Sequence, residues 1–126
     1  MAPGDHILVV EDDDDIREVM QEALSSEGFQ VDAAKDGLDA LGKLDGDGRH
    51  PLLILLDMMM PKMDGETFLK TLRGMPALAE APVIVISGNA AARETARALH
   101  AAGCLMKPFE LEDLLRVVRK VNDPAH

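Results

Sequence analysis

Short apolar runs alternate with amphipathic segments along the whole chain. Five of the runs have the length and composition of β-strands: His6–Val10, Gln30–Ala34, Leu52–Asp57, Val83–Ser87 and a short one around Cys104–Met106. The third and fourth runs are almost continuously apolar, which is typical of strands that are buried on both faces of a parallel sheet.

Between these runs, apolar residues recur every three or four positions, the spacing of a helix with one buried face. The first such stripe runs from Ile16 to Leu24 and stops before Gly28, a residue that favours helix ends. The last runs from Leu111 to Val118. Three further helices are expected at Leu38–Leu44, Glu66–Arg73 and Ala90–Ala102, and Gly42 weakens the first of these.

The order of the segments predicts an α/β fold of five β-α units, with one parallel sheet covered by helices on both faces. In such open sheets, ligands bind beyond the carboxyl ends of the strands. Acids, a hydroxyl and a lysine occupy those ends: Glu11 and Asp12 follow the first strand, Asp57 ends the third, Ser87 ends the fourth, and Lys107 follows the fifth. We expect these side chains to meet at one rim of the sheet.

The charges at this rim favour a cation. Three carboxylates within a few ångströms repel one another unless positive charge lies between them. A divalent ion and the ammonium of Lys107 would balance Glu11, Asp12 and Asp57. Because every ligand is an oxygen, a hard ion is expected, and Mg²⁺, which needs few protein ligands, fits best. The other acids of the run, residues 13–15, suit a helix N-cap and first turn.

The same rim suits phosphoryl transfer. A carboxylate can act as a nucleophile and form an aspartyl phosphate, and the reaction depends mainly on positioning and on neutralising the phosphoryl oxygens. The metal, Lys107, the Ser87 hydroxyl and the backbone amide of Gly88 are candidates for these contacts. Asp57 ends its strand before a Met-rich turn closed by Pro61. We therefore expect Asp57 to project into the rim and to be the nucleophile.

Composition narrows the class of protein. A chain of 126 residues has the length of one domain, so a single domain over residues 1–126 is expected. The net charge of −10 disfavours direct binding to nucleic acid and to anionic membranes, because phosphate binding needs Lys and Arg. Cys104 is the only cysteine, which excludes an internal disulfide, and the start MAPGDH lacks the pattern of a signal peptide. A cytoplasmic protein is expected.

Four stretches, in this order and spacing, resemble the receiver domain of two-component response regulators: ILVVEDDDDIRE, LLILLDMMMPKMDG, PVIVISG and KPFELEDLL. The resemblance extends from Ile7 to about Val121. It implies a flavodoxin-like (βα)5 fold with strand order 2-1-3-4-5. It also implies a signalling switch that takes a phosphoryl group, with Mg²⁺, from a histidine kinase or phosphotransfer protein. Such a domain catalyses its own phosphorylation and dephosphorylation, and its output would be a protein–protein contact or a phosphate relay.

The resemblance also implies a role for individual residues. Carried over position by position, Asp57 is the phosphoacceptor and Ser87 and Lys107 contact the phosphoryl group. The metal is held by Asp57, by Asp12, by Glu11 through water and by the backbone carbonyl of Met59. The bond between Lys107 and Pro108 is expected to be cis.

The sequence departs from the family pattern at the expected output face. Relatives usually carry an aromatic residue three positions before the lysine, where this chain has Cys104, and Ala after the hydroxyl, where this chain has Gly88. We therefore expect an output face around Cys104, Ala90 and Ala91. Its switch is expected to be movement of the loop Gly88–Ala92 rather than rotation of an aromatic side chain.

Other functions would need other residues. A pseudo-receiver, which binds a partner without accepting phosphate, would lack the acid pair, the acceptor or the lysine, and all are present. A phosphatase of the haloacid dehalogenase type would need a small or hydroxyl residue where Ile16 stands. A flavodoxin-like carrier would need a loop rich in Ser, Thr and Gly in place of the acids. An EF-hand would need a central Gly.

Two further features have ordinary explanations. The run Met58–Met60 is better explained by packing than by a soft-metal site, given its oxygen-rich neighbours. The four histidines share no face with the acids and are all expected at the surface: His6, His50, His100 and His126.

Overall fold

The computed structural model describes residues 6–46, 51–58, 64–76, 78–79 and 81–122. Strands and helices alternate along these residues, as the sequence pattern predicts. The strands are β1 (Ile7–Val10), β2 (Val31–Ala34), β3 (Leu53–Asp57), β4 (Val83–Ser87) and β5 (Gly103–Met106). The helices are α1 (Asp14–Ser26), α2 (Gly37–Gly46), α3 (Gly65–Arg73), α4 (Ala90–Ala98) and α5 (Leu111–Asn122).

All five strands lie in one parallel sheet in the order β2-β1-β3-β4-β5, which confirms the predicted flavodoxin-like topology. Strand order reverses at β1, because β2 lies on one side of it and β3 on the other. The register pairs Val10 with Leu56 and Ile86 with Asp57. The residues that follow β1 therefore come out beside the end of β3, where this fold class binds its ligands.

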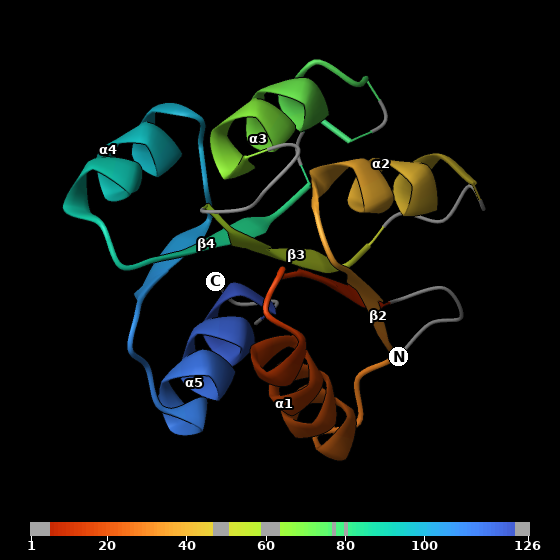
Figure 1. Ribbon diagram of the computed structural model, residues 1–126, viewed down its shortest axis with the longest axis vertical. Coiled ribbons are helices and arrows are strands. Elements are labelled where there is room, and N and C mark those ends of the chain that lie inside the picture. Colours follow the sequence, from red (N-terminus) through yellow and green to blue (C-terminus); the bar gives the residue numbers. More distant parts are fainter. Residues whose placement is uncertain (1–5, 47–50, 59–63, 77, 80, 123–126) are drawn as a thin grey trace.

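Helices cover both faces of the sheet: α1 and α5 lie on one face and α2, α3 and α4 on the other (Figure 1). Successive residues of β1 supply the two cores in turn, as side chains alternate along a strand. Ile7 and Val9 belong to the cluster that includes Met20 and Leu114, whereas Leu8 and Val10 belong to the cluster around Phe68. The central strands are thus apolar on both faces, as their sequences predict.

Helix α4 is shorter than predicted. The Ala-rich run indicated a helix over Ala90–Ala102, but the helix ends at Ala98 and His100 adopts a left-handed conformation with φ of 61°. The amide of Ala102 donates to the carbonyl of Val83 over 2.7 Å, which begins the pairing of β5 with β4. The chain has to leave the helix before this residue, and no Gly or Pro in the run signals the turn.

The prediction that all four histidines lie at the surface is wrong for His6. This side chain is buried, because His6 stands immediately before β1 in the middle of the sheet, where its carbonyl accepts a hydrogen bond from the amide of Leu52 over 2.7 Å. His100 is exposed, as expected. The other two, His50 and His126, lie outside the described residues.

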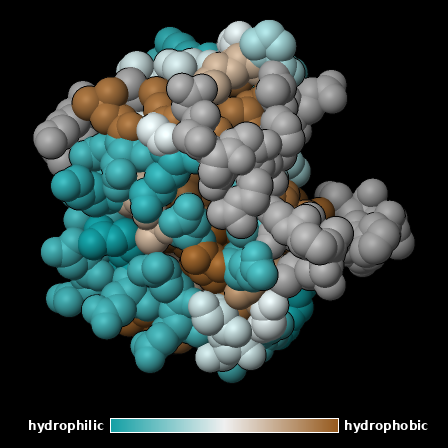
Figure 2. Space-filling model, turned by 90° about the vertical axis from the view of Figure 1, so that its right-hand side faces the viewer, coloured by the Kyte–Doolittle hydropathy of each residue, from teal (hydrophilic) through white to brown (hydrophobic). Residues whose placement is uncertain are grey.

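The β2 side of the molecule is seen in Figure 2, where hydrophilic residues cover much of the lower part and smaller hydrophobic patches lie between them. In the edge strand β2, Asp32 pairs with Lys43 at 3.4 Å. Charged side chains on an edge strand disfavour pairing with a second sheet.

Within the described part of the chain, no helix has the length and apolar character needed to cross a membrane.

Candidate functional site

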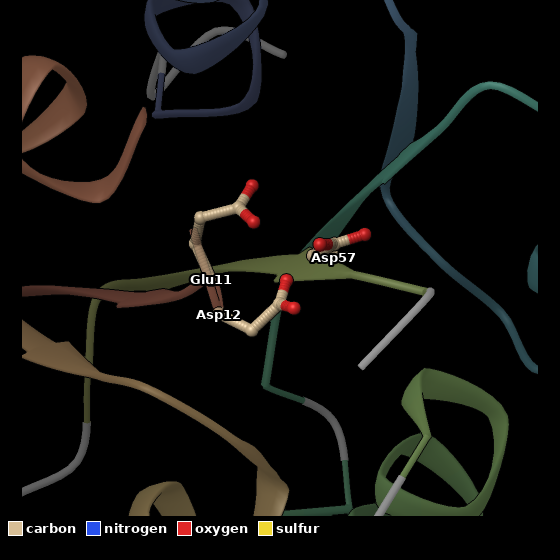
Figure 3. Close-up of side chains that lie close together, drawn as sticks. All are labelled: Glu11, Asp12 and Asp57. Carbon is tan, nitrogen blue, oxygen red and sulfur yellow. The ribbon is translucent and has the colours of Figure 1, made fainter. Parts of the chain in front are cut away.

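Three carboxylates meet where β1 and β3 end. Glu11 and Asp12 follow β1, Asp57 is the last residue of β3, and one oxygen from each lies within 4.8 Å of the other two (Figure 3). Glu11 and Asp57 are 1% and 2% exposed, whereas Asp12 is exposed to solvent. The structure therefore brings together the three acids that the sequence placed at strand ends.

Lys107 joins this cluster from the end of β5. Its ammonium Nζ lies 3.3 Å from Oε1 of Glu11 and 3.4 Å from Oδ2 of Asp57. The backbone holds it there, because the Lys107 amide donates to the carbonyl of Ser87 over 2.9 Å. The bond between Lys107 and Pro108 is cis, as the family resemblance implies. The Lys107 side chain thus reaches the acids of β1 and β3 from the edge strand β5.

Ser87, the last residue of β4, is buried beside this cluster, but its hydroxyl points back to its own loop. The Oγ accepts a hydrogen bond from the amide of Asn89 over 3.0 Å. The Asn89 side chain in turn caps α4 by accepting from the amide of Ala91 over 2.7 Å. A change in the direction of the Ser87 hydroxyl would therefore act on the start of α4.

Gly88 follows Ser87 and is exposed. A Cβ at this position would lie 3.8 Å from Cβ of Lys107, an ordinary contact. The position therefore accepts Ala without steric conflict.

Burial and mutual repulsion shift the ionisation of the cluster. Burial raises the pKa of Glu11 to about 7, and the neighbouring Asp57 adds to the increase by hydrogen bonding and by its charge. For Lys107, burial lowers the pKa but the charges of Asp57 and Glu11 outweigh it, so the net pKa is raised. One lysine is thus shared by two buried carboxylates, with the exposed Asp12 next to them.

The cluster has the features of a site for a hard divalent cation. Oε1 of Glu11 is buried and, among the described residues, makes no well-directed hydrogen bond, although Lys107 Nζ is close. Buried polar atoms without such a bond are rare and costly. A divalent ion among the carboxylates would satisfy this oxygen and balance the remaining charge. Met59, whose carbonyl is the expected fourth ligand, lies outside the described residues.

Two residues that the sequence analysis did not single out position this site. The first is Arg17, whose Nη1 donates to the backbone carbonyl of Glu11 over 2.9 Å and whose guanidinium also pairs with Asp14. It holds the acidic loop against α1, together with the cap formed by Asp13 on the amide of Ile16 over 3.0 Å. The spacing of Asp14 and Arg17, one turn apart, is the signal that pointed to this contact.

The second is Gly65, the first residue of α3, which lies directly on the residue after Asp57. A Cβ here would stand 2.6 Å from Cα of Met58 and 2.9 Å from the carbonyl oxygen of Asp57. The Gly65 amide donates to the Met58 carbonyl over 3.2 Å. Asp64 caps α3 by accepting a hydrogen bond from the amide of Thr67 over 2.8 Å. The cap fixes the start of the helix, and with it the position of Gly65 against Met58. An Asp-Gly pair at a helix start was the available signal.

An apolar groove of about 600 Å³ opens beside the acids, between α1 and the segment that joins β5 to α5. Its lining is Asp15, Ile16, Val19, Met20, Lys107, Pro108, Phe109, Glu110 and Leu111. Val19 and Leu111 are 45% and 41% exposed. Because Lys107 belongs both to this groove and to the acid cluster, a protein seated in the groove would lie next to Asp57.

The expected output face consists of small side chains that are at least partly exposed. Cys104 is half-buried and packs against the core on the α4 side, and Ala90 and Ala91 are exposed. A shallow hollow of about 410 Å³ lies between α4 and β5, where Cys104 contributes to the lining together with Arg93 and Arg97.

Comparisons with known proteins agree on one family. A family model described as the response regulator receiver domain matches residues 7–119. The response regulator MprA of Mycobacterium tuberculosis is 37% identical over 115 residues, which cover 90% of this chain and 48% of MprA. The transcriptional regulatory protein CseB of Streptomyces coelicolor is 37% identical over 123 residues, which cover 96% of this chain and 50% of CseB. The chain thus spans about half the length of these curated relatives.

Solved structures give the same answer for the fold. The chemotaxis response regulator CheY4 of Vibrio cholerae superposes with a TM-score of 0.84 at 30% identity, over 92% of this chain and 97% of that protein. The receiver domain of NtrX from Brucella abortus superposes with a TM-score of 0.78 at 31% identity, over 94% of this chain and 98% of that domain.

Proposed function

The chain belongs to the response regulator receiver family of two-component signalling, and from this premise we propose that phosphorylation of Asp57 by a histidine kinase or phosphotransfer protein switches its state. One observation carries the proposal. Asp57 ends the central strand β3, buried, with Lys107 at 3.4 Å and two further acids beside it. A pseudo-receiver that is not phosphorylated has no need for this constellation.

The chemistry follows from the charges. An Asp57 oxygen attacks the phosphorus of a phosphohistidine, a P–O bond forms, the P–N bond breaks, and the leaving imidazole nitrogen keeps the electron pair and takes up a proton from solvent. Lys107 is placed to pair with a phosphoryl oxygen as its present contacts to the acids loosen. When bound, Mg²⁺ held by Asp12, Asp57 and, through water, Glu11 would supply positive charge to the phosphoryl oxygens.

Ser87 and Gly88 are proposed to complete the phosphoryl contacts. The phosphoryl group adds acceptor oxygens and negative charge, which need donors. The Ser87 hydroxyl, at the end of β4, is one candidate, and the Gly88 amide is the next donor along the chain. In forming this contact, the hydroxyl has to turn its proton away from the carbonyl of Asn89, to which it donates over 3.4 Å. Phosphorylation is thereby coupled to the loop that starts α4 and to the output residues Ala90 and Ala91.

The donor protein is proposed to seat in the apolar groove between α1 and the β5–α5 segment. The groove shares Lys107 with the acid cluster, so an occupant would bring a phosphohistidine next to Asp57. Exposed Val19 and Leu111 offer apolar contact, and the acids Asp15 and Glu110 at its edge favour a partner with basic residues around an apolar centre.

The output is proposed to be a protein–protein contact or a further phosphate transfer. We propose that residues 1–126 form one receiver domain acting in the cytoplasm, and the net charge of −10 supports an output without direct binding to nucleic acid or membrane lipid. Phosphorylation and its reversal are reactions of the domain itself, with no external substrate turned over.

The acceptor is tested by incubation with acetyl phosphate and Mg²⁺, followed by intact-protein mass spectrometry. We expect the wild-type chain to gain one phosphate and Asp57→Ala to gain none, because the substitution removes the proposed nucleophile. Asp32→Ala, an acid of the edge strand β2, serves as the control and should behave as wild type. Full uptake by Asp57→Ala would refute the assignment, and no uptake by wild type would favour the pseudo-receiver.

A further inference from the structure

Arg73, the last residue of α3, ties three segments together through its guanidinium. Within the described part of the chain, Nη1 donates to the carbonyls of Ala79 and Ala81 over 3.1 and 2.8 Å. Nε donates to the carbonyl of Leu99 over 3.0 Å, and Nη2 to that of His100 over 3.1 Å. One side chain thus joins the end of α3, the segment before β4 and the end of α4.

The bonds to Leu99 and His100 hold the C-cap residue of α4 and the residue after it, and they come from a different helix. The last carbonyls of a helix lack partners within it and carry the negative end of the helix dipole, so a cation there is favourable. Hydrogen bonds from a charged donor are roughly twice as strong as neutral ones. The Arg73 side chain is half-buried, and its guanidinium donates to backbone carbonyls. Arg73 therefore positions neighbouring segments of the backbone.

The two ends of α4 are held very differently. At the C-terminal end, Ala96 is buried and Leu99 packs against the core, in addition to the bonds from Arg73. At the N-terminal end, Ala90 and Ala91 are exposed, and the first turn is anchored by the local cap of Asn89 and by the small side chain of Ala92, which is half-buried against the core. Alanine side chains offer little surface with which to resist a movement.

We infer that Arg73 is the fixed hinge of α4, so that phosphorylation pivots this helix about its C-terminal end. When Ser87 turns from Asn89 towards the phosphoryl group, the start of α4 moves while the turn Leu99–Ala101 stays in place. A partner that reads the output face therefore reads the first half of α4. The inference rests on the proposed phosphorylation of Asp57, with Arg73 as a positioning residue outside the reaction.

The anchor itself can be tested without any phosphoryl group. Replacing the guanidinium by an apolar chain of similar length, Arg73→Met, should speed hydrogen exchange of the Leu99, His100 and Ala101 amides by at least about tenfold, because the last turn of α4 loses its cap. Lys70→Met, which removes an exposed cation one turn earlier on α3, is the matched control and should leave these rates unchanged. Equal rates in wild type and Arg73→Met would overturn the anchor.

The pivot is tested by amide chemical shifts with and without beryllofluoride and Mg²⁺. In wild type, we expect changes over residues 88–93 and none over residues 99–101. In Arg73→Met, the changes should spread to residues 99–101, with the milder variant Arg73→Lys between the two. Equal changes at both ends of α4 in wild type would overturn the hinge. No change near Asp57 and Ser87 would instead refute phosphorylation, and the pivot with it. The hydrogen-exchange experiment would still test whether Arg73 anchors the end of α4.

Discussion

At the scale of single residues, the site is a balance between buried negative charge and one lysine. Glu11 and Asp57 are almost fully buried, and Lys107 is shared between them. Burying charge is costly unless it is compensated, so the metal-free site is held at the expense of stability. Gly65 shows the complementary constraint, because the space beside Asp57 is too small for a Cβ. Both features lead to measurable effects on stability.

The first effect is a dependence of stability on pH in the absence of metal. Glu11 ionises with a pKa of about 7 in the folded chain against an ordinary value of 4.5. Between these values, the folded chain holds a proton that the unfolded chain has released, so raising the pH favours unfolding. We expect the free energy of unfolding in EDTA to fall by about 1–3 kcal/mol between pH 5 and 7.5 through this group. Glu11→Gln should flatten the decrease in urea unfolding curves; equal slopes in the two proteins would contradict the expectation.

The second effect separates two glycines. Gly65→Ala should destabilise the fold by about 1–3 kcal/mol, because the new Cβ would overlap backbone atoms of Met58 and Asp57. Gly42→Ala, in the exposed interior of α2 with no described atom within 4 Å of the new Cβ, should stabilise it by roughly 0.5–1 kcal/mol. Denaturant unfolding of both variants checks the pair. A neutral result for Gly65→Ala would mean that α3 moves away from Asp57 without cost.

At the scale of elements, the strands were predictable and the end of α4 was not. Continuous apolar runs mark β3 and β4, because a strand that is buried on both faces has no solvent-facing positions for polar residues. Their ends then bring Glu11, Asp12, Asp57 and Lys107 together by topology alone. The end of α4 depends instead on the bond between Ala102 and Val83, which no local pattern reveals.

The same limit applies to side-chain contacts between distant segments. Arg73 contacts carbonyls up to 27 positions away, and nothing in its neighbourhood in the sequence distinguishes it from the exposed basic residues of the chain. The burial of His6 likewise follows from its place before a central strand rather than from its polarity. The direction of the Ser87 hydroxyl, towards Asn89, is a local choice that a sequence pattern leaves open.

The groove beside α1 gives a prediction at this scale. Val19→Asp should reduce phosphate transfer from a phosphohistidine protein that phosphorylates the wild-type chain by about tenfold or more, because a buried apolar contact becomes an unpaired charge. Uptake from acetyl phosphate, a small donor that needs no docking, should be unchanged. Leu38→Asp, at a somewhat more exposed apolar position on α2, is the control and should affect neither rate. Loss of both reactions in Val19→Asp would show that the change disturbs the acid site instead.

At the scale of the whole molecule, the acid cluster lies where two neighbouring strands of the sheet end. Glu11 and Asp12 follow β1 and Asp57 ends β3, so a cation bound there would link two segments that separate on unfolding. A ligand that binds only the folded chain stabilises the whole fold by mass action. The chain also carries a net charge of −10, and added salt weakens the self-repulsion of such a surface without any specific site. Both effects raise stability, so they have to be separated.

Thermal unfolding with increasing Mg²⁺, at constant ionic strength set by NaCl, makes this separation. If the cation binds the cluster, the melting temperature should rise with Mg²⁺ in wild type and in Asp14→Ala, whose carboxylate pairs with Arg17 away from the cluster. In Asp12→Ala most of the rise should disappear, because a proposed direct ligand is lost while the net charge changes by the same amount as in Asp14→Ala. Equal losses in the two variants would mean that Mg²⁺ acts on the acidic surface as a whole. The comparison is decisive because the two acids differ in position but not in charge.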